Sequence, residues 1–454
     1  MKAVWAMLIA GAGLAAGCGK KDFLEAKPSS DLFIPTTLDD FQALMDKDLV
    51  INDMPELGEL SSDNYYLLYS TWQGLNSTKE RNAYTWASDT YQGQGGVDDW
   101  NVPYQQVFYA NTVLAGIDDA PVTAATQPRL NAIKGAAYFV RAYAFYNLAQ
   151  LFAPVYDSAT AAGDLGIPLR ITPGIDAPSV RASVKDTYNQ VLTDLAQAYM
   201  LLPAAIPFNN RNRPSQPAAM ALRARVYLSM RAYAQAGACA DSSLRLYNTL
   251  INYNTISTSS PTPFNKTNNT ETMYQARILV GTQVLKGVTV AGCIIDSTLY
   301  RSYDVNDLRQ SIFFNAVPNA KGSYTNNIYC FSGIATDEMY LVRAECYARA
   351  RNTTAAMADL NTLLQNRYKP GFTPLTASGP ENALGIILTE RRKELFFRGL
   401  RWTDLRRLNK EGYNISLTRV LNGQTYQLPP GDLRYTFPIP PDVINLGGIQ
   451  QNPR

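Results

Sequence analysis

Apolar residues recur at helical spacing in several long segments, and this feature most narrows the folds open to the chain. Spacings of three and four place side chains on one face of an α-helix. We predict helices over residues 37–48, 102–117, 132–152, 183–202, 218–236 and 336–350. In residues 132–152 the apolar face consists of Ile133, Ala137, Val140, Ala144, Leu148 and Leu151. The chain is therefore expected to be mainly α-helical.

Three of these helices share a short sequence in which arginine lies between an aliphatic residue and alanine: Val140-Arg141-Ala142, Leu222-Arg223-Ala224 and Val342-Arg343-Ala344. Small alanines on the packed face let helices approach closely, as in paired-helix repeats of the tetratricopeptide type. The intervals, 82 and 120 residues, are not multiples of that repeat's length of about 34 residues. We predict a tetratricopeptide-like α-α superhelix of degenerate helix pairs.

Residues 251–331 interrupt the helical pattern. They are rich in Ser, Thr and Asn and contain short β-type runs such as "ARILVGTQVL". Such composition is typical of loops and short strands. We predict an inserted loop- and β-rich subdomain here, between a helical region over 37–250 and a C-terminal region over 332–454.

The N-terminus has the pattern of an export signal. Lys2 precedes an apolar run from Val4 to Ala16, and small residues lead to Cys18. This run is too short to span a bilayer, which takes about 20 residues, but it is typical of a secretory signal. We interpret residues 1–17 as a lipoprotein signal peptide, Cys18 as the acylated residue and 18–36 as a tether. A plain signal with an incidental cysteine is the alternative.

The composition of the chain argues against several kinds of catalytic, metal-binding and nucleic-acid-binding site. The chain has no histidine, which excludes Ser-His-Asp triads and HExxH zinc sites. Lys plus Arg number 41 and Asp plus Glu 38, and this near balance argues against nucleic acid as a partner. The four cysteines after Cys18 form no C-x-x-C pair, so buried thiols and one disulfide both stay open.

Aromatic residues concentrate in residues 61–100, which also contain Asp, Asn and Arg. Rings with polar neighbours suit a surface that binds uncharged polar ligands, and they equally suit an ordinary tyrosine-rich core. The aromatic residues here are Tyr65, Tyr66, Tyr69, Trp72, Tyr84, Trp86, Tyr91 and Trp100.

The basic stretch "ERRKELFFRGLRWTDLRR" at 390–407 could at first be taken for a nucleic-acid-binding helix. Such a helix would keep one basic face free for phosphates. Here we expect Arg391 to reach Glu394, and Arg401 and Arg407 to reach Asp404, at helical spacing. We predict a structural Arg–carboxylate network packed on an apolar seam. It comprises Glu390, Arg391, Arg392, Glu394, Gly399, Arg401, Trp402, Asp404, Arg406 and Arg407.

This stretch resembles the signature of the SusD/RagB family of outer-membrane nutrient-binding lipoproteins of Bacteroidota. The resemblance continues in "DFLEAKPSSDLFIPTT", "YANTVL", "GAAYFVRAYAFYNLAQLFAPV", "TDEMYLVRAECYARA" and "FPIPPDVINLGGIQQNP". Two departures are Gly447-Gly448, where the family usually has Asn-Pro, and Lys20-Lys21, where surface-exposed members often carry acidic residues.

The resemblance implies a binding protein without catalytic residues, cofactor or metal. It would be lipid-anchored in the outer membrane, facing outside. It would capture an oligosaccharide or a peptide and deliver it to a SusC-like TonB-dependent transporter. The implied fold is four tetratricopeptide-like helix pairs that carry a loop-rich subdomain.

Ligand sites in the family combine aromatic rings with polar side chains that bond hydroxyl groups. By this resemblance the candidate ligand residues are Asp63, Asn64, Trp72, Arg81, Trp86, Tyr300 and Tyr324. Two other classes stay open. One is a lipid-anchored tetratricopeptide adaptor that binds proteins, and the other is a glycoside hydrolase that uses carboxylates.

Overall fold

The structure, a computed structural model, describes residues 34–174, 179–285, 292–315 and 319–454. The predicted signal peptide, Cys18 and most of the tether therefore lie outside the described residues. Residues Thr36–Arg454 form one compact unit. The division of this unit at residues 250 and 331 stays a prediction.

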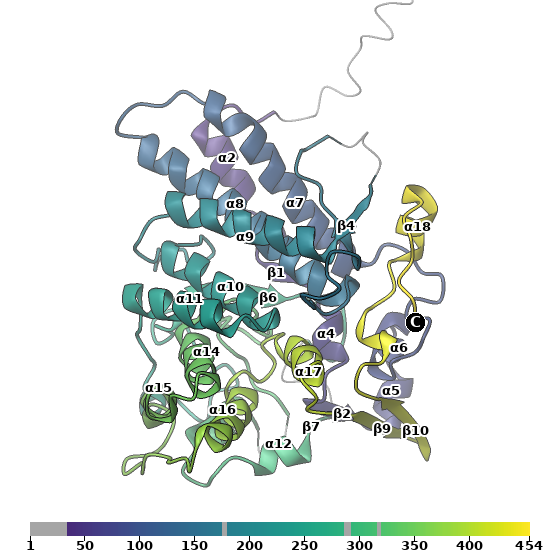
Figure 1. The fold of residues 1–454 in the computed structure, drawn as a ribbon, viewed down its shortest axis with the longest axis vertical. Coiled ribbons are helices and arrows are strands. Elements are labelled where there is room, and N and C mark those ends of the chain that lie inside the picture. Colours follow the sequence, from purple (N-terminus) through teal and green to yellow (C-terminus); the bar gives the residue numbers. More distant parts are fainter. Residues whose placement is uncertain (1–33, 175–178, 286–291, 316–318) are drawn as a thin grey trace, which may run out of the picture. The chain divides into compact units, whose positions relative to one another are not determined.

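Long helices packed in succession build this unit (Figure 1). Helix α8 packs between α7 and α9; α10 pairs with α11, and α14 packs on α11, α15 and α16. The predicted mainly α-helical array of helix pairs is confirmed. The long helices are α7 (Asp98–Gly116), α8 (Gln127–Phe152), α9 (Val184–Leu201), α10 (Gln216–Ser229), α11 (Tyr233–Leu246), α14 (Thr336–Arg349), α15 (Thr353–Gln365) and α16 (Pro380–Glu394).

The predicted single helix over 218–236 is wrong, because two helices occupy this part of the chain. Helix α10 ends at Ser229 and α11 begins at Tyr233. Arg231 between them has a φ of 62°, in the left-handed region that an α-helix cannot contain. The apolar periodicity continues across the turn since both helices bury one face in the same core.

The shared Arg-Ala sequences join neighbouring helices by ion pairs. Arg141 in α8 binds both carboxylate oxygens of Asp194 in α9, at 2.8 and 2.7 Å. Arg343 in α14 binds Asp359 in α15 in the same way. Both pairs are two-pronged, the arrangement that fixes orientation most strongly. Arg223 in α10 differs, since its Nη1 donates to the sulfur of Met220 at 3.9 Å.

Short strands connect the 251–331 region to the rest of the chain. Strand β5 (Thr272–Tyr274) pairs with β8 (Ile334–Ala335), β6 (Arg277–Ile278) with β1 (Asp53–Met54), and β7 (Cys293–Ile295) with β2 (Tyr65–Leu67). All three partners lie outside residues 251–331. The region is therefore held against the helical body by backbone hydrogen bonds on several sides.

The remaining elements are short, and they precede α7, connect the long helices or follow α16. They are α2 (Leu38–Met45), α3 (Asp48–Ile51), α4 (Leu57–Leu60), α5 (Tyr69–Gln73), α6 (Thr78–Tyr84), η1 (Ile117–Asp119), β3 (Leu165–Pro168), β4 (Arg181–Ser183), η2 (Tyr253–Thr255), α12 (Ser297–Arg301), α13 (Leu308–Phe313), α17 (Arg401–Asn409), β9 (Leu417–Leu421), β10 (Gln424–Leu428), η3 (Leu433–Tyr435) and α18 (Pro441–Gly447).

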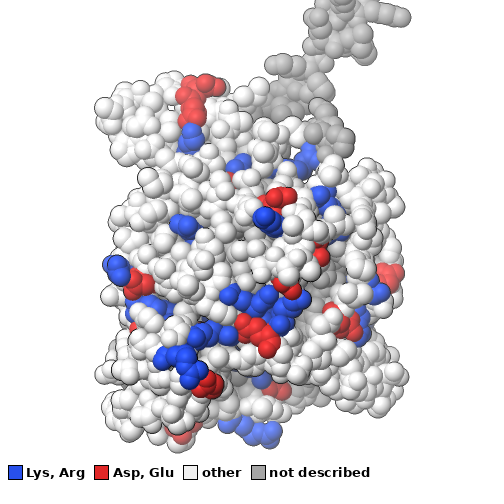
Figure 2. Space-filling view, viewed as in Figure 1, with Lys and Arg blue, Asp and Glu red and all other residues white. Residues whose placement is uncertain are grey.

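The four cysteines in the described part of the chain form no disulfide. Cys239, Cys293, Cys330 and Cys346 are buried free thiols, so the disulfide alternative is wrong. No helix in the described part of the chain is both long and apolar enough to cross a membrane. On the face in Figure 2, basic residues lie among acidic ones at mid-height, and most of the surface is uncharged.

A buried cluster where α4, α6 and α7 meet predicts a pH dependence of stability. Lys79 lies 2.8 Å from both Glu56 and Asp99, so two carboxylates share one cation. Burial raises the pKa of Glu56 from 4.5 to about 7. The folded state therefore binds a proton between these pH values that the unfolded chain has released, and stability contributed by Glu56 falls as the pH rises through this window.

We expect the free energy of unfolding to fall by about 1–3 kcal/mol from pH 5 to pH 8 relative to the Glu56→Gln variant, since one pKa unit is worth about 1.4 kcal/mol. Urea denaturation of both proteins at four pH values measures the difference. Parallel curves for the two proteins would show that Glu56 titrates as it does in the unfolded chain.

Candidate functional site

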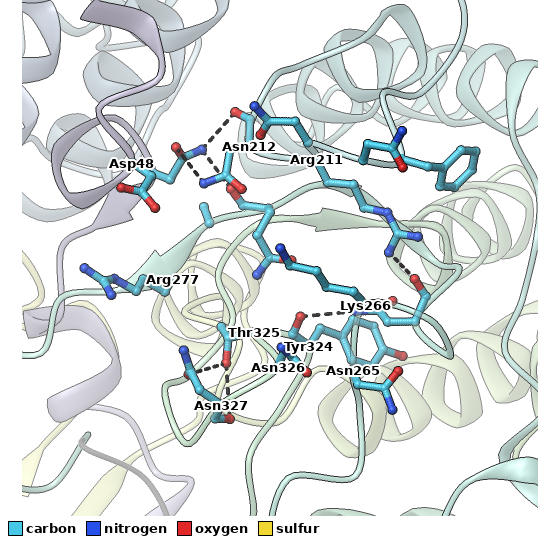
Figure 3. Close-up of a pocket in the computed structure, with 17 residues that line it drawn as sticks. Asp48, Arg211, Asn212, Asn265, Lys266, Arg277, Tyr324, Thr325, Asn326 and Asn327 are labelled. Carbon is cyan, nitrogen blue, oxygen red and sulfur yellow. Dashed lines mark hydrogen bonds between the residues drawn. The ribbon is translucent and has the colours of Figure 1, made fainter. Parts of the chain in front are cut away.

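A polar pocket opens where the α9–α10 loop meets α3 and two loops of the 251–331 region (Figure 3). We call it the amide pocket, because most of its side chains are asparagine or glutamine. Its volume is about 240 Å³. The lining residues are Asp48, Asn52, Phe208, Asn209, Asn210, Arg211, Asn212, Asn265, Lys266, Asn269, Gln275, Ala276, Arg277, Tyr324, Thr325, Asn326 and Asn327.

One wall of the amide pocket is fixed by Asn52, which lies between α3 and β1. Its Nδ2 donates to the carbonyl oxygens of Asn212 at 3.0 Å and Gln275 at 2.8 Å. The Nδ2 of Asn212 donates back to the Asn52 Oδ1 at 3.3 Å. A single buried amide thus holds the α9–α10 loop and the strand region together. This wall is preorganised, which lowers the entropy lost on binding a ligand.

Other amides of the pocket fix its loops. Buried Asn269 donates to the carbonyl of Tyr324 at 3.2 Å, and Asn327 Oδ1 accepts from the backbone N–H of Tyr329 at 2.7 Å. The side chains of Asn209 and Asn326 are exposed and make no hydrogen bond with any described residue. The pocket therefore has both locked amides and free amides.

An aromatic ring and a cation lie together on the α9–α10 loop. The ring of Phe208 is 49% exposed, and the Arg211 guanidinium lies 5.0 Å from its centre. Arg277 on β6 is neutralised by Asp53 at 2.7 Å and lies 5.3 Å from the ring of Tyr329. Each ring thus has a guanidinium beside it, which orders both groups.

This chemistry suits a ligand with many hydroxyl groups. A primary amide both donates and accepts hydrogen bonds, and so does a hydroxyl group. An exposed aromatic face at the pocket supplies apolar contact for a ring with C–H groups.

Tyr324 is the one predicted ligand residue that lines the amide pocket, and its ring is turned into the interior. It is 2% exposed, and its hydroxyl lies 2.8 Å from both the Tyr253 hydroxyl and the Glu271 carboxylate. The ring is therefore part of the core beneath the pocket, and the loop that follows it carries Asn326 and Asn327.

Asp63 and Asn64 lie elsewhere, next to the 390–407 stretch. Arg401 binds both oxygens of Asp63 at 2.7 and 2.8 Å. Burial alone would raise the pKa of Asp63, but Arg401 and Arg392 outweigh it and hold the pKa well below its usual range. Buried Asn64 donates to Glu59 at 2.7 Å. In this structure both side chains have protein partners.

Trp86 and Arg81 have structural partners as well. Trp86 is 3% exposed and its Nε1 donates to the carbonyl of Ser61 at 3.0 Å. Arg81 donates to the carbonyl of Leu75 and to the Thr78 hydroxyl. Trp86 has no free ring face for a ligand in this conformation.

Trp72 and Tyr69 form a partly exposed surface that we call the aromatic patch. The two rings are stacked with centres 6.0 Å apart, and Tyr69 is exposed. The remaining predicted residue, Tyr300, is half-buried on α12 with its ring centre 5.6 Å from that of Phe314. The structure thus separates the predicted residues into several places.

The arginines of the 390–407 stretch mostly have carboxylate partners, and several partners come from distant segments. Arg391 pairs with Asp404 at 2.8 Å and not with Glu394. Arg407 binds Asp404 and also Glu345 of α14. The expected local pairs at Arg391 and Arg401 are wrong because distant segments supply other partners. Arg309 and Arg367 bind Glu394, and Asp63 binds Arg401.

Arg406 is the exception in this stretch. Among the described residues it donates only to the carbonyl oxygens of Gln150 and Ala153, and burial lowers its pKa to about 10. Its role is to cap the C-terminal end of α8, where carbonyl groups lack helical partners.

Three buried carboxylates are spaced as metal ligands could be. The carboxylate oxygens of Glu271, Asp337 and Glu394 lie within 4.8 Å of one another. Arg367 binds Glu271 and Glu394, each at 2.7 Å, and Arg398 binds Asp337 at 3.0 Å. Protein cations already neutralise this cluster, so its donors do not fit a metal ion.

Sequence reasoning missed the amide pocket, although its residues leave a sequence signal. Asparagine is repeated in "FNNRN" (208–212), "NKTNN" (265–269) and "TNN" (325–327). These three runs lie far apart in the chain and meet in one pocket. Asparagine is also common in plain turns, so clustering alone would have been a weak guide.

Paired helices that carry a loop region with a polar pocket define a helical binding scaffold. Residues 22–228 match a family model described as starch-binding associating with outer membrane, and residues 245–454 match the SusD family. The chain therefore belongs to the SusD/RagB family. No curated protein matches the sequence.

Several solved structures of SusD-like proteins have the same fold as this chain. A SusD superfamily protein from Bacteroides fragilis superposes with a TM-score of 0.73 at 19% identity, covering 92% of this chain and 99% of its own. One from Bacteroides thetaiotaomicron gives 0.71 at 20%, covering 92% and 100%. A laminarin-binding SusD-like protein gives 0.64 at 17%, covering 92% and 100%. These likenesses show the shared fold.

Proposed function

We propose that this protein captures an oligosaccharide in the amide pocket and delivers it to a SusC-like TonB-dependent transporter. A lipid on Cys18 would hold it on the outer membrane, facing outside. The observation that carries the proposal is the meeting of free amides and an exposed aromatic ring in one preorganised pocket. Family membership and the laminarin-binding structural relative support a glycan as the ligand.

The lining favours binding over hydrolysis. Glycoside hydrolysis generally uses two carboxyl groups on either side of the scissile bond. Of the described residues that line the amide pocket, only Asp48 is acidic. Release of reducing ends from a bound glycan would revive the hydrolase alternative.

The aromatic patch is a second candidate for glycan contact, since Trp72 was predicted from the sequence and keeps a partly exposed ring beside Tyr69. Stacking on sugar faces is what exposed aromatic rings of this kind can provide. The other residues predicted for this surface are turned toward protein partners, so the patch has fewer polar groups than the amide pocket.

The partner is tested by purifying the tagged full-length chain from the envelope of its own host. Co-purification with a TonB-dependent transporter is the expected result. Recovery of other protein partners alone would favour the adaptor alternative.

We expect Phe208→Ala to weaken oligosaccharide affinity about fivefold to tenfold, because it removes the exposed ring. This equals about 1–1.4 kcal/mol of binding free energy. A glycan array identifies the ligand, and calorimetry compares the variants. Phe108→Ala is the matched control, since Phe108 is similarly exposed at 42% and lines a different pocket. Equal affinities for the Phe208→Ala variant and the wild type would place the ligand elsewhere.

A further inference from the structure

We propose that the amide pocket selects acidic oligosaccharides and that Arg211 and Lys266 bind the carboxylate of a uronic acid residue. The inference rests on the proposed function and narrows it from glycans in general to one chemical class. Among the described residues, the pocket leaves the cations Arg211 and Lys266 without an ion-pair partner.

Arg211 is a cation with unused donors. Its one hydrogen bond within the described residues goes from Nη1 to the carbonyl of Asn269. Its Nε is buried without an acceptor, and Nη2 also has none among the described residues. Because Nε is buried, the donors that a ligand in the pocket can reach are the N–H groups of Nη2, and a hydrogen bond from a guanidinium to a carboxylate is charge-assisted and strong. Burial lowers the pKa of Arg211, as expected for a guanidinium without a counter-ion.

Neighbouring arginines show that the lack of a partner is particular to this site. Arg213, two residues along the same loop, binds Asp46 at 2.6 Å, and Arg277 on the opposite wall binds Asp53 at 2.7 Å. Arg211 forms no ion pair with any residue that the structure describes. The protein thus neutralises the guanidinium groups on both sides of Arg211 and leaves this one for a ligand.

Lys266 adds a second charge to the same space. It is exposed on the loop that also carries Asn265 and lines the pocket. The residues in the described ranges give it no ion pair. Figure 3 shows Arg211 and Lys266 reaching the pocket from two different loops. Asp48, the one acidic residue among the described lining residues, is exposed. Its charge attracts Arg277 and helps to raise the pKa of that guanidinium. Asp53 already neutralises Arg277.

These groups together match a sugar acid. A uronic acid residue has a carboxylate on a ring whose other substituents are hydroxyl groups. The carboxylate can accept from Arg211 Nη2 and from Lys266, the hydroxyl groups fit the free amides, and the ring face fits Phe208. A neutral oligosaccharide would leave Arg211 partly desolvated and without an acceptor, which costs binding energy.

The test uses probes that differ at the carboxyl group alone. Oligogalacturonates and oligoglucuronates are each compared with their methyl esters, which keep the ring and the hydroxyl groups but lack the charge. Calorimetry with the full-length chain in detergent is expected to show at least tenfold tighter binding of the acids at about 50 mM salt. The preference is expected to shrink as salt rises, because exposed charges are screened.

The variants assign the preference to residues. Arg211→Gln is expected to bind acid and ester equally while keeping its affinity for the ester, and Lys266→Gln to lose part of the preference. Arg213→Gln, whose charge is already paired, is expected to keep the full preference. Circular dichroism confirms that each variant is folded.

Each other outcome decides against the inference. Equal binding of acids and esters, or binding of neutral oligosaccharides alone, overturns the acidic class and leaves the proposed function standing. A preference that survives Arg211→Gln overturns the role of Arg211. Binding of sulfated glycans without uronates overturns the carboxylate. Failure of every oligosaccharide to bind overturns the proposed function itself.

Discussion

The Arg309→Met variant is expected to lose about 3–5 kcal/mol of unfolding free energy, because it leaves buried carboxylates without their cation. Arg309 on α13 is fully buried. It lies 2.7 Å from Asp307, 2.5 Å from Glu390 and 3.0 Å from Glu394. Methionine fills a similar volume but donates no hydrogen bond. Urea denaturation followed by circular dichroism measures the loss.

An exposed ion pair provides the control. Arg129 and Asp39 lie 2.5 Å apart, with their side chains 45% and 84% exposed. Arg129→Met is expected to change the free energy of unfolding by less than about 1 kcal/mol, as is usual for surface pairs. If Arg309→Met cost no more than this control, the buried network would not hold the 390–407 stretch to α13.

Trp86→Ala is expected to cost about 3–5 kcal/mol of stability, since it removes a large buried side chain and leaves a cavity. The Nε1 of Trp86 donates to Ser61, and the Arg419 guanidinium lies 5.1 Å from the ring. The Trp86 ring thus joins the aromatic-rich segment to strand β9. Thermal and urea denaturation measure the effect.

Trp72→Ala provides the contrast on the neighbouring surface. Trp72 is half-buried, so we expect a stability loss below about 2 kcal/mol. Oligosaccharide affinity is measured for both variants. A loss of affinity in Trp72→Ala with normal folding would assign the aromatic patch to the binding surface. A well-folded Trp86→Ala variant with weakened affinity would contradict the structural role given to Trp86.

The structural role of the 390–407 stretch was predictable, while its pairing was not. The density of arginine, acid and aromatic residues indicated a packed network. Only tertiary contacts could bring Asp63 to Arg401 and Glu345 to Arg407, across more than 60 residues of chain in the shorter case. Local helical spacing gave the right pair at Arg407, where donor and acceptor lie on one turn.

The location of the candidate site was even harder to predict from the sequence than the ion pairs were, because it depends on tertiary structure. Aromatic residues drew attention to residues 61–91, yet rings such as Trp86 fill the core there. The asparagine runs looked like turns, and chain folding placed three of them around one space. Burial decides whether a ring packs or binds, and sequence composition does not report burial.

The sequence by itself determined the helical architecture and the family, because apolar spacing and the Arg-rich stretch are local patterns that can be recognised in the chain without its tertiary structure. Tertiary structure alone decided which polar groups stay unpaired. A charge or amide is available to a ligand only when no other segment of the chain satisfies it, and that depends on contacts between residues far apart in sequence. Arg213 binds the carboxylate of Asp46 at the end of α2, whereas Arg211 lies at an open pocket and has no carboxylate partner among the described residues.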